Sequence, residues 1–140
     1  MEHTNRCVFG CGGEAEDSIG HYSRCPVTLS VLRRVLRVSV APCHGIAFWL
    51  MDIANDEDMV TCSALSSYAA YKTFNLYRTS GKAVKKEVAA DAMTQFIIQT
   101  AGSDPKLGNF LDCRVSMKNI IPILFIYLPK MAKIKSGMLM

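Results

Sequence analysis

The chain has 140 residues, of which half are hydrophobic and six are cysteine, and its formal net charge is +4. This composition suits one domain, or one small domain with an appendage, and it excludes disordered, collagen-like and disulfide-scaffold proteins. The charge is uneven, because residues 1–104 sum to −1 whereas residues 105–140 carry six Lys/Arg and one acid. A positive balance confined to the C-terminal part argues against a domain that binds nucleic acid with its whole surface.

The first ten residues, MEHTNRCVFG, contain neither an apolar core nor a small-residue cleavage site. No signal peptide is therefore predicted. We expect an intracellular protein of the nucleus or cytoplasm that is not secreted. In such a reducing compartment, clustered cysteines favour a metal ion over disulfides.

The segment CVFGCGGEAEDSIGHYSRC, residues 7–25, has the spacing C-x3-C-x9-H-x3-C. Thiolate and imidazole are the ligands that zinc prefers, and four protein ligands in a tetrahedron leave no position for a reactive water. The sequence therefore predicts a small CCHC zinc knuckle over residues 1–26, with a structural zinc ion as cofactor. The alternatives are unliganded cysteines beside an incidental histidine, or a disulfide framework. The expected metal ligands are Cys7, Cys11, His21 and Cys25.

Other cysteines and histidines compete less well for the metal. His3 lies four residues before the first ligand, and Cys43 and His44 are adjacent, which rarely lets both side chains reach one ion. Cys62 falls within an apolar helical pattern and is expected in the core. Cys113 is assigned no role.

Helical patterns dominate residues 27–101, so the predicted fold is mainly α, with three to four helices after the knuckle. Short breaks rich in Gly, Pro and Asp separate these helices, and Asp56 is placed to cap the longest of them. The expected helices cover residues 26–38, 46–54, 57–79 and 83–101.

Residues 102–140 are predicted as a loop followed by an apolar and basic tail of poorly defined order. The segment GSDPKLGN, residues 102–109, has the composition of a loop. The segment NIIPILFIYLP, residues 119–129, is intensely apolar, but it is far shorter than the roughly twenty residues that a membrane span needs. We expect a buried strand or a short core helix there, with an interfacial segment as the alternative, and no transmembrane segment.

Basic and aromatic side chains lie close to the expected ligands. Zinc knuckles bind single-stranded bases through such neighbours. Alternatively, Phe9 and Tyr22 pack over the metal and the arginines form a solvated face. The acids Glu14, Glu16 and Asp17 lie in the same loop and count against a strong phosphate-binding surface. The candidate nucleic-acid contacts are Arg6, Arg24, Arg33, Arg34 and Arg37.

The knuckle with its filling, CVFGCGGEAEDSIGHYSRCP, resembles the zinc-binding segment near the C-terminus of reverse transcriptases from non-LTR retrotransposons. The shared features are the cysteine pair, the run Glu16-Asp17-Ser18, the pair His21-Tyr22, and the Cys25-Pro26 step into a helix. The resemblance implies a detached C-terminal fragment of an RNA-directed DNA polymerase, in which this region helps to position template RNA or target DNA. The polymerase motif aromatic-x-Asp-Asp is absent, so no enzymatic activity is expected.

Two functions of different classes remain. The first is a structural-zinc nucleic-acid-binding module, with RNA or DNA as its partner. The second is a zinc-stabilised helical protein-interaction module without a nucleic-acid role. No small-molecule substrate is expected, because a four-ligand site is closed and the sequence shows no set of nucleophile and base. The stripe that would meet a protein partner comprises Tyr68, Tyr71, Phe74 and Tyr77.

Overall fold

The computed structural model has a mainly α-helical fold with a Cys/His knuckle before the helices, as the sequence predicted. It describes residues 6–12, 18–50, 56–79, 84–116 and 124–125. Its α-helices are α1 (Ile19–Tyr22), α2 (Pro26–Val31), α3 (Gly45–Trp49), α4 (Glu57–Tyr77), α5 (Lys86–Gly102) and α6 (Pro105–Ser116). Two further helical turns are η1 (Leu32–Leu36), a π-turn, and η2 (Pro42–His44), a 3-10 turn.

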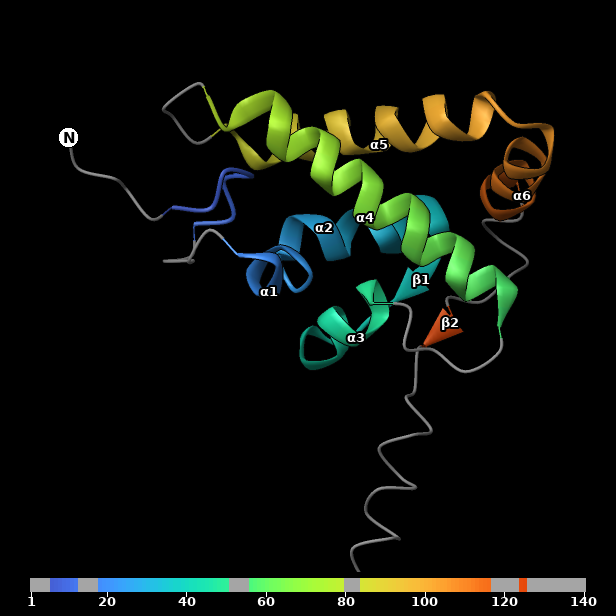
Figure 1. Ribbon diagram of the computed structural model, residues 1–140, viewed down its shortest axis with the longest axis horizontal. Helices are drawn as coiled ribbons and strands as arrows, with labels where there is room; N and C mark the ends of the chain where they lie inside the picture. The colour runs from blue at the N-terminus through green and yellow to red at the C-terminus, as the bar shows by residue number, and fades with distance from the viewer. Residues whose placement is uncertain (1–5, 13–17, 51–55, 80–83, 117–123, 126–140) are drawn as a thin grey trace, which may run out of the picture.

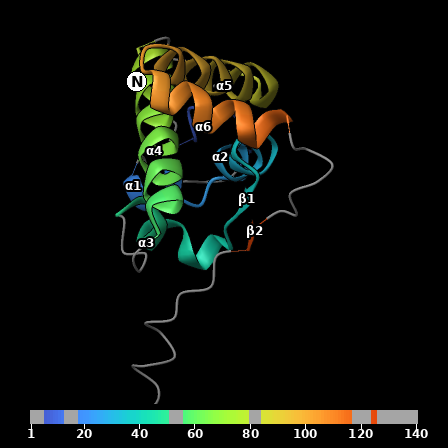
Figure 2. The same cartoon turned by 90° about the vertical axis from the view of Figure 1, so that its right-hand side faces the viewer.

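The helices form two layers around one hydrophobic core. Helices α4 and α5 lie side by side, and α6 folds back across the end of α5 (Figures 1 and 2). The shorter α2 and η1 pack beneath them against α5, α6 and α4, and α3 packs beneath α4. The knuckle lies at the end of this assembly where α4 ends and α5 begins (Figure 1). The knuckle is therefore next to the end of α4 and the start of α5 (Figure 1).

Small side chains explain the close packing of α4 on α5. Ala69 and Ala70 of α4 are buried, as are Ala89 and Ala90 of α5. Residues that lack long side chains let two helix backbones approach each other closely. The prediction that Asp56 caps α4 is confirmed, because its carboxylate accepts hydrogen bonds from the backbone N–H groups of Asp58 and Met59.

The helix expected over residues 26–38 is interrupted. The α-helical part ends at Val31, the π-turn η1 follows, and Arg37 ends the segment in the left-handed conformation with φ 58°. A left-handed residue is a common way to end a helix. It frees Val38 to continue as an extended, fully buried strand residue. The extra residue in the π-turn keeps Leu32 and Leu36 in the core.

The prediction of a loop over residues 102–109 is wrong for its second half, which forms the start of α6. The Asp104 carboxylate accepts hydrogen bonds from the N–H groups of Lys106 and Leu107, at 2.8 and 3.3 Å. Pro105 occupies the first helical position, where its missing N–H costs nothing. Asp and Pro thus start a helix here where the sequence pattern suggested a turn.

A short parallel pair of strands joins distant parts of the chain. Strand β1 (Val38–Ser39) pairs with β2 (Leu124–Phe125) in the register Val38 to Leu124 and Ser39 to Phe125. Part of the apolar segment 119–129 is therefore a strand, and the rest of it lies outside the described residues. Helix α3 covers the first part of the helix expected over 46–54, and residues 51–55 also lie outside. None of the helices that the structure describes has the length and apolar character needed to span a membrane.

Candidate metal centre

Two short segments bring the predicted ligands together. Cys7 and Cys11 lie on a tight turn in which the Gly10 N–H donates to the Cys7 carbonyl at 3.1 Å. Gly10 has φ 71°, a left-handed conformation that glycine adopts without steric cost. His21 lies in α1 and Cys25 is the N-cap residue of α2, so the second ligand pair spans the junction between two helices.

The four ligand atoms have the geometry of a tetrahedral metal site. All of them lie within 4.8 Å of one another. Cys7 Sγ lies 3.7 Å from Cys25 Sγ, and Cys11 Sγ lies 3.6 Å from His21 Nε2. A tetrahedron with metal–sulfur bonds of about 2.3 Å has edges of about 3.8 Å, so these separations fit a central ion. The cluster can hold a metal ion, and the chemistry of three thiolates and one imidazole suits zinc.

No disulfide competes with this arrangement. The structure describes all six cysteines and joins none of them in a disulfide. The separation of 3.7 Å between Cys7 Sγ and Cys25 Sγ is much longer than the S–S bond of about 2.05 Å. The disulfide alternative therefore has no support in the geometry.

Hydrophobic packing shields the ligands from water. Cys7 and Cys25 are buried and Cys11 is half-buried. Phe9 is fully buried, and its ring centroid lies 4.9 Å from that of Tyr22. Tyr22 in turn makes an edge contact with the His21 imidazole at 5.2 Å. Phe9 and Tyr22 thus pack over the ligands, as one of the two interpretations of the sequence proposed.

The hydrogen bond between Cys7 and Cys25 shifts the pKa values of these two thiols in opposite directions. The hydrogen bond with Cys25 lowers the pKa of Cys7 to about 5, despite the opposing effect of burial. The same hydrogen bond raises the pKa of Cys25 well above the usual range, and burial adds to this effect. The lowered pKa favours the thiolate form of Cys7, and the raised pKa favours the thiol form of Cys25. A bound cation would displace the remaining proton, since metal ligation requires thiolates.

Backbone contacts attach the knuckle to two distant parts of the chain. A Cβ at Gly10 would overlap the Val84 carbonyl oxygen and lie 3.1 Å from the Lys86 nitrogen. The Val84 N–H also donates to the Val8 carbonyl at 3.4 Å. On the other side, Gly45 at the start of α3 lies directly against the Ser23 carbonyl. Sequence reasoning missed these contacts, because each joins residues far apart in the chain.

The remaining cysteines and histidines lie apart from the centre. Cys43 is exposed on η2, and neither it nor His44 belongs to the cluster. Cys62 is fully buried in α4, which confirms its place in the core. Cys113 is exposed on α6. His3 lies outside the described residues.

The predicted arginines fall into two groups. Arg6 and Arg24 are exposed next to the ligands. Arg33 and Arg34 are exposed on η1, eight and nine residues after Cys25 and beyond the end of α2. Arg37 is half-buried. The structure therefore does not gather all five arginines beside the metal centre.

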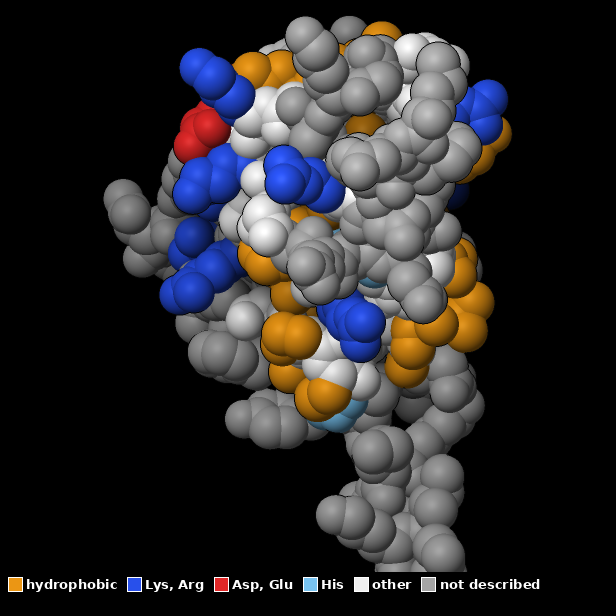
Figure 3. All heavy atoms as spheres, turned by 90° about the vertical axis from the view of Figure 1, so that its left-hand side faces the viewer, with side chains coloured by type: hydrophobic (Ala, Val, Ile, Leu, Met, Phe, Trp, Pro, Cys, Tyr) orange, Lys and Arg blue, Asp and Glu red, His pale blue; other side chains and the backbone are white. Residues whose placement is uncertain are grey.

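Three basic residues that the sequence analysis did not select also lie near the knuckle. Lys85 and Lys86 are exposed, and they belong to the backbone segment that contacts Gly10. Arg78, the C-cap residue of α4, is exposed one turn beyond Phe74, whose ring lies 5.3 Å from Tyr22. Blue Lys and Arg side chains are prominent on this side of the molecule in Figure 3. The basic end is defined as Arg6, Arg24, Arg78, Lys85 and Lys86.

Searches against protein-family models, curated proteins and solved structures gave no significant match for this chain. The geometry alone defines the class: a helical protein with a Cys₃His cluster that can hold a metal ion.

Proposed function

We propose that the chain is a nucleic-acid-binding module organised by a structural zinc ion. The observation that carries this proposal is the basic end built around the Cys₃His cluster. Four protein ligands fill a tetrahedron, so zinc would order the knuckle and would have no open position for catalysis. This proposal includes no enzymatic activity, and it places the protein in an intracellular, reducing setting that keeps the cysteines as ligands.

The basic end supports contacts to a phosphate backbone. Its five cations come from the knuckle, the end of α4 and the start of α5, where Glu87 is an exposed acid. The acids Glu14, Glu16 and Asp17 of the knuckle loop lie outside the described residues. Cations from separate segments can follow several phosphates of one strand, which a single helix face does less well. The resemblance to the C-terminal segment of retrotransposon reverse transcriptases agrees with this role, since that segment is expected to position RNA or DNA.

The first test joins metal content to binding. Protein purified without chelator should contain one zinc per chain, and Cys11→Ser should lose it. Binding of a fluorescent single-stranded RNA of about 12 nucleotides should weaken by at least about tenfold between roughly 50 and 200 mM salt. A folded wild-type protein without metal would contradict the ligand assignment. A metal-loaded protein that binds neither RNA nor DNA would contradict the nucleic-acid role.

The second test separates the two groups of basic residues. The double variant Lys85→Gln/Lys86→Gln removes two cations at the knuckle, and Arg33→Gln/Arg34→Gln removes two that lie further along the chain. Each lost phosphate contact should reduce the salt slope for a single strand by about 0.7. We expect the salt slope of the lysine variant to fall by nearly twice that value, because both lysines contact phosphates. The salt slope of the arginine variant should fall by less. The opposite ranking would place the binding surface elsewhere.

A protein-interaction role is the second candidate, because α4 exposes large apolar side chains. Tyr68, Tyr71 and Leu76 are 46%, 62% and 53% exposed. Phe74 is only half-buried and contacts Tyr22, so the expected stripe is partly used within the fold. Self-association that sedimentation velocity shows to be insensitive to salt, together with no binding of RNA or DNA, would favour this function.

A further inference from the structure

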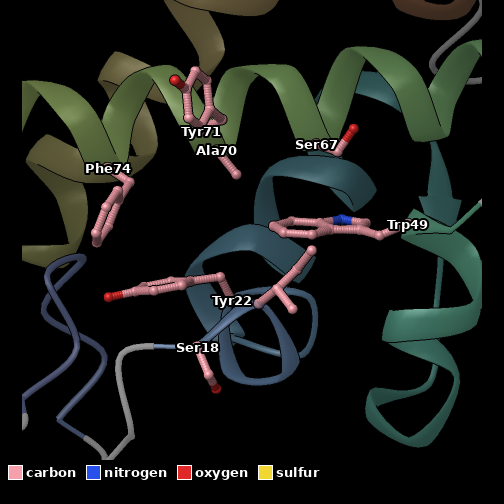
Figure 4. A pocket seen from close by; sticks show the side chains of 8 residues that line it. Ser18, Tyr22, Trp49, Ser67, Ala70, Tyr71 and Phe74 are labelled. Atoms are coloured by element: carbon pink, nitrogen blue, oxygen red, sulfur yellow. The ribbon is translucent and has the colours of Figure 1, made fainter.

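A cavity of about 370 Å³ lies next to the metal centre, between α1, α3 and α4. Its walls are largely aromatic. Figure 4 shows the indole of Trp49 lying between α4 and the turn that carries Tyr22, and the Tyr22 ring pointing toward Phe74. Tyr71 lies above them on α4. Cavities of this size, with mainly apolar walls, are typical of sites for small molecules or single chemical groups.

One wall of this aromatic pocket is fixed and the other is exposed. Tyr22 is held on both sides, because its ring contacts His21 at 5.2 Å and Phe74 at 5.3 Å. The ring of Tyr71 is 62% exposed at the mouth, and Ile19 is 59% exposed on the α1 side. The pocket thus has a fixed aromatic inner wall and an exposed mouth, which suits the entry of a flat group that stacks on an aromatic ring.

The serine side chains of the pocket are neutral and serve the fold. Ser18 Oγ accepts a hydrogen bond from the His21 N–H at 3.2 Å, and Ser67 Oγ donates to the Ala64 carbonyl at 3.3 Å. Figure 4 shows both hydroxyl groups directed away from the Trp49 indole. None of the described residues that line the pocket is charged. The pocket therefore suits a flat, uncharged group and suits a phosphate poorly.

Positive charge lies beside the pocket and not inside it. Arg24 is exposed two residues after Tyr22. Arg78 is exposed on the α4 face of Tyr71 and Phe74, because Phe74 follows Tyr71 by three residues and Arg78 follows Phe74 by four. A strand whose phosphates contact these arginines could place one base in the pocket. The combination of a neutral aromatic pocket and an adjacent cationic rim matches the two halves of a nucleotide.

We propose that the aromatic pocket takes an unpaired base of a single-stranded nucleic acid, stacked against Trp49, with Tyr71 at the mouth of the pocket. This inference rests on the proposed function and adds a preference for single strands over duplexes. A duplex keeps its bases stacked within the helix, so it cannot fill the pocket without base extrusion.

The experiment uses Trp49, the one tryptophan in the chain, as its probe. Titration of the zinc-loaded protein with a single-stranded RNA of about 12 nucleotides should quench tryptophan fluorescence to saturation, and the matching duplex should not. Tyr71→Ala should weaken binding by about tenfold, within the range measured for a base-stacking ring. Tyr71→Phe should retain binding. Tyr68→Ala is the matched control, because Tyr68 is also exposed on α4 but does not line the pocket.

The outcomes distinguish the pocket from the general function. If Tyr71→Ala binds like the wild type while salt still weakens binding, the pocket inference fails and nucleic-acid binding stands. The pocket inference also fails if the wild type binds without a change in Trp49 fluorescence. If the wild type binds no RNA or DNA at all, both proposals fail. Circular dichroism of each variant establishes that it is folded.

Discussion

At the scale of single residues, the six cysteines occupy three environments. Cys43 and Cys113 are exposed, and Cys62 is fully buried. The other three belong to the metal cluster, where a bound ion would occupy their sulfurs. Reactivity of a cysteine depends on access to water and on its thiolate fraction. The cysteines of the three environments should therefore react at different rates with a thiol reagent.

We predict that an aromatic disulfide reagent titrates two thiols rapidly in the metal-loaded protein. Chelation should add the knuckle thiols, with Cys7 reacting before Cys25, because the hydrogen bond between them lowers the pKa of Cys7 to about 5 and raises that of Cys25. Cys62 should react only after denaturation. Absorbance of the released thiolate counts each class, and Cys43→Ser should remove one of the fast thiols. Five rapid thiols in a metal-loaded sample would contradict the cluster.

A second prediction concerns Cys62 in alkaline solution. Burial raises the pKa of this thiol from 9.0 to about 11, although nearby Arg114 opposes the shift. The folded state then holds its proton more tightly than the unfolded state. The stabilisation is fully present below about pH 9 and is lost as the pH rises toward about 11. It amounts to at most about 2–3 kcal/mol.

Urea denaturation of the wild type and of Cys62→Ala at several pH values tests this linkage. The variant lacks some packing at every pH, but it also lacks the titrating group. The difference in the free energy of unfolding should therefore shrink between about pH 8 and about pH 10.5. The other titrating groups are common to both proteins. A constant difference across that range would contradict the shifted pKa.

The local part of the site could be predicted from the sequence, and the distant part could not. The four ligands fall within nineteen residues, so spacing and ligand chemistry were enough to find them. Two lysines of the basic end, Lys85 and Lys86, lie next to the knuckle because α5 runs back along α4. The sequence shows the two adjacent lysines, but their position next to the knuckle depends on how α4 and α5 pack.

At the scale of secondary-structure elements, the two aspartate caps show what sequence patterns can and cannot indicate. Asp56 precedes a long apolar pattern, and it was predicted to cap that helix. Asp104 is followed by Pro105 and soon by Gly108, which together resemble a loop. Gly108 lies where α6 packs on α5, since a Cβ at this position would lie 3.4 Å from the Ala101 carbonyl oxygen, an ordinary van der Waals distance. Close packing of α6 on α5 offsets the poor helix propensity of glycine.

We predict that Asp56→Ala and Asp104→Ala each lower the free energy of unfolding by about 1 kcal/mol. Each substitution removes a carboxylate that accepts two backbone N–H groups at a helix start. Thermal and urea denaturation measure the loss. Asp91→Ala, at an exposed position within α5, is the control and should change stability by less than about 0.5 kcal/mol. Equal effects at all three positions would argue against specific capping.

The break in the helix over residues 26–38 had no clear sequence signal. No Gly or Pro stands between Val27 and Val38, and the apolar spacing continues through η1. The left-handed Arg37 lets Val38 and Val40 enter the core as extended residues, beside a strand from the far end of the chain. Tertiary packing, and not local propensity, sets this boundary.

At the scale of the whole molecule, the knuckle is one side of an interface with the helical layers. Gly10 contacts the start of α5, and Gly45 of α3 contacts the backbone between His21 and Cys25. The fold therefore leaves no room for a side chain at either glycine. Loss of the metal should weaken this interface as well as the knuckle itself.

We predict that Gly10→Ala destabilises the protein strongly, by at least about 2 kcal/mol. The new Cβ would overlap the Val84 carbonyl, and the left-handed φ of 71° adds strain. Gly102→Ala is the matched control, because open space surrounds that position at the end of α5. The control should be neutral or slightly stabilising. Thermal denaturation with zinc and with chelator compares them, and equal melting temperatures for the two variants would contradict the close contact.

During synthesis on the ribosome, the contact between Val8 and Val84 forms only after residue 84 has emerged. The ligand residues emerge first, and their spacing lets them capture an ion early. The backbone segment that supports them emerges some sixty residues later, after α4 is complete. At roughly 5–20 residues per second, this delay lasts several seconds. If the cluster takes up its ion at this stage, the nascent chain holds it in a knuckle that lacks the contacts from α5, so a shortage of the metal would affect the protein mainly during its synthesis.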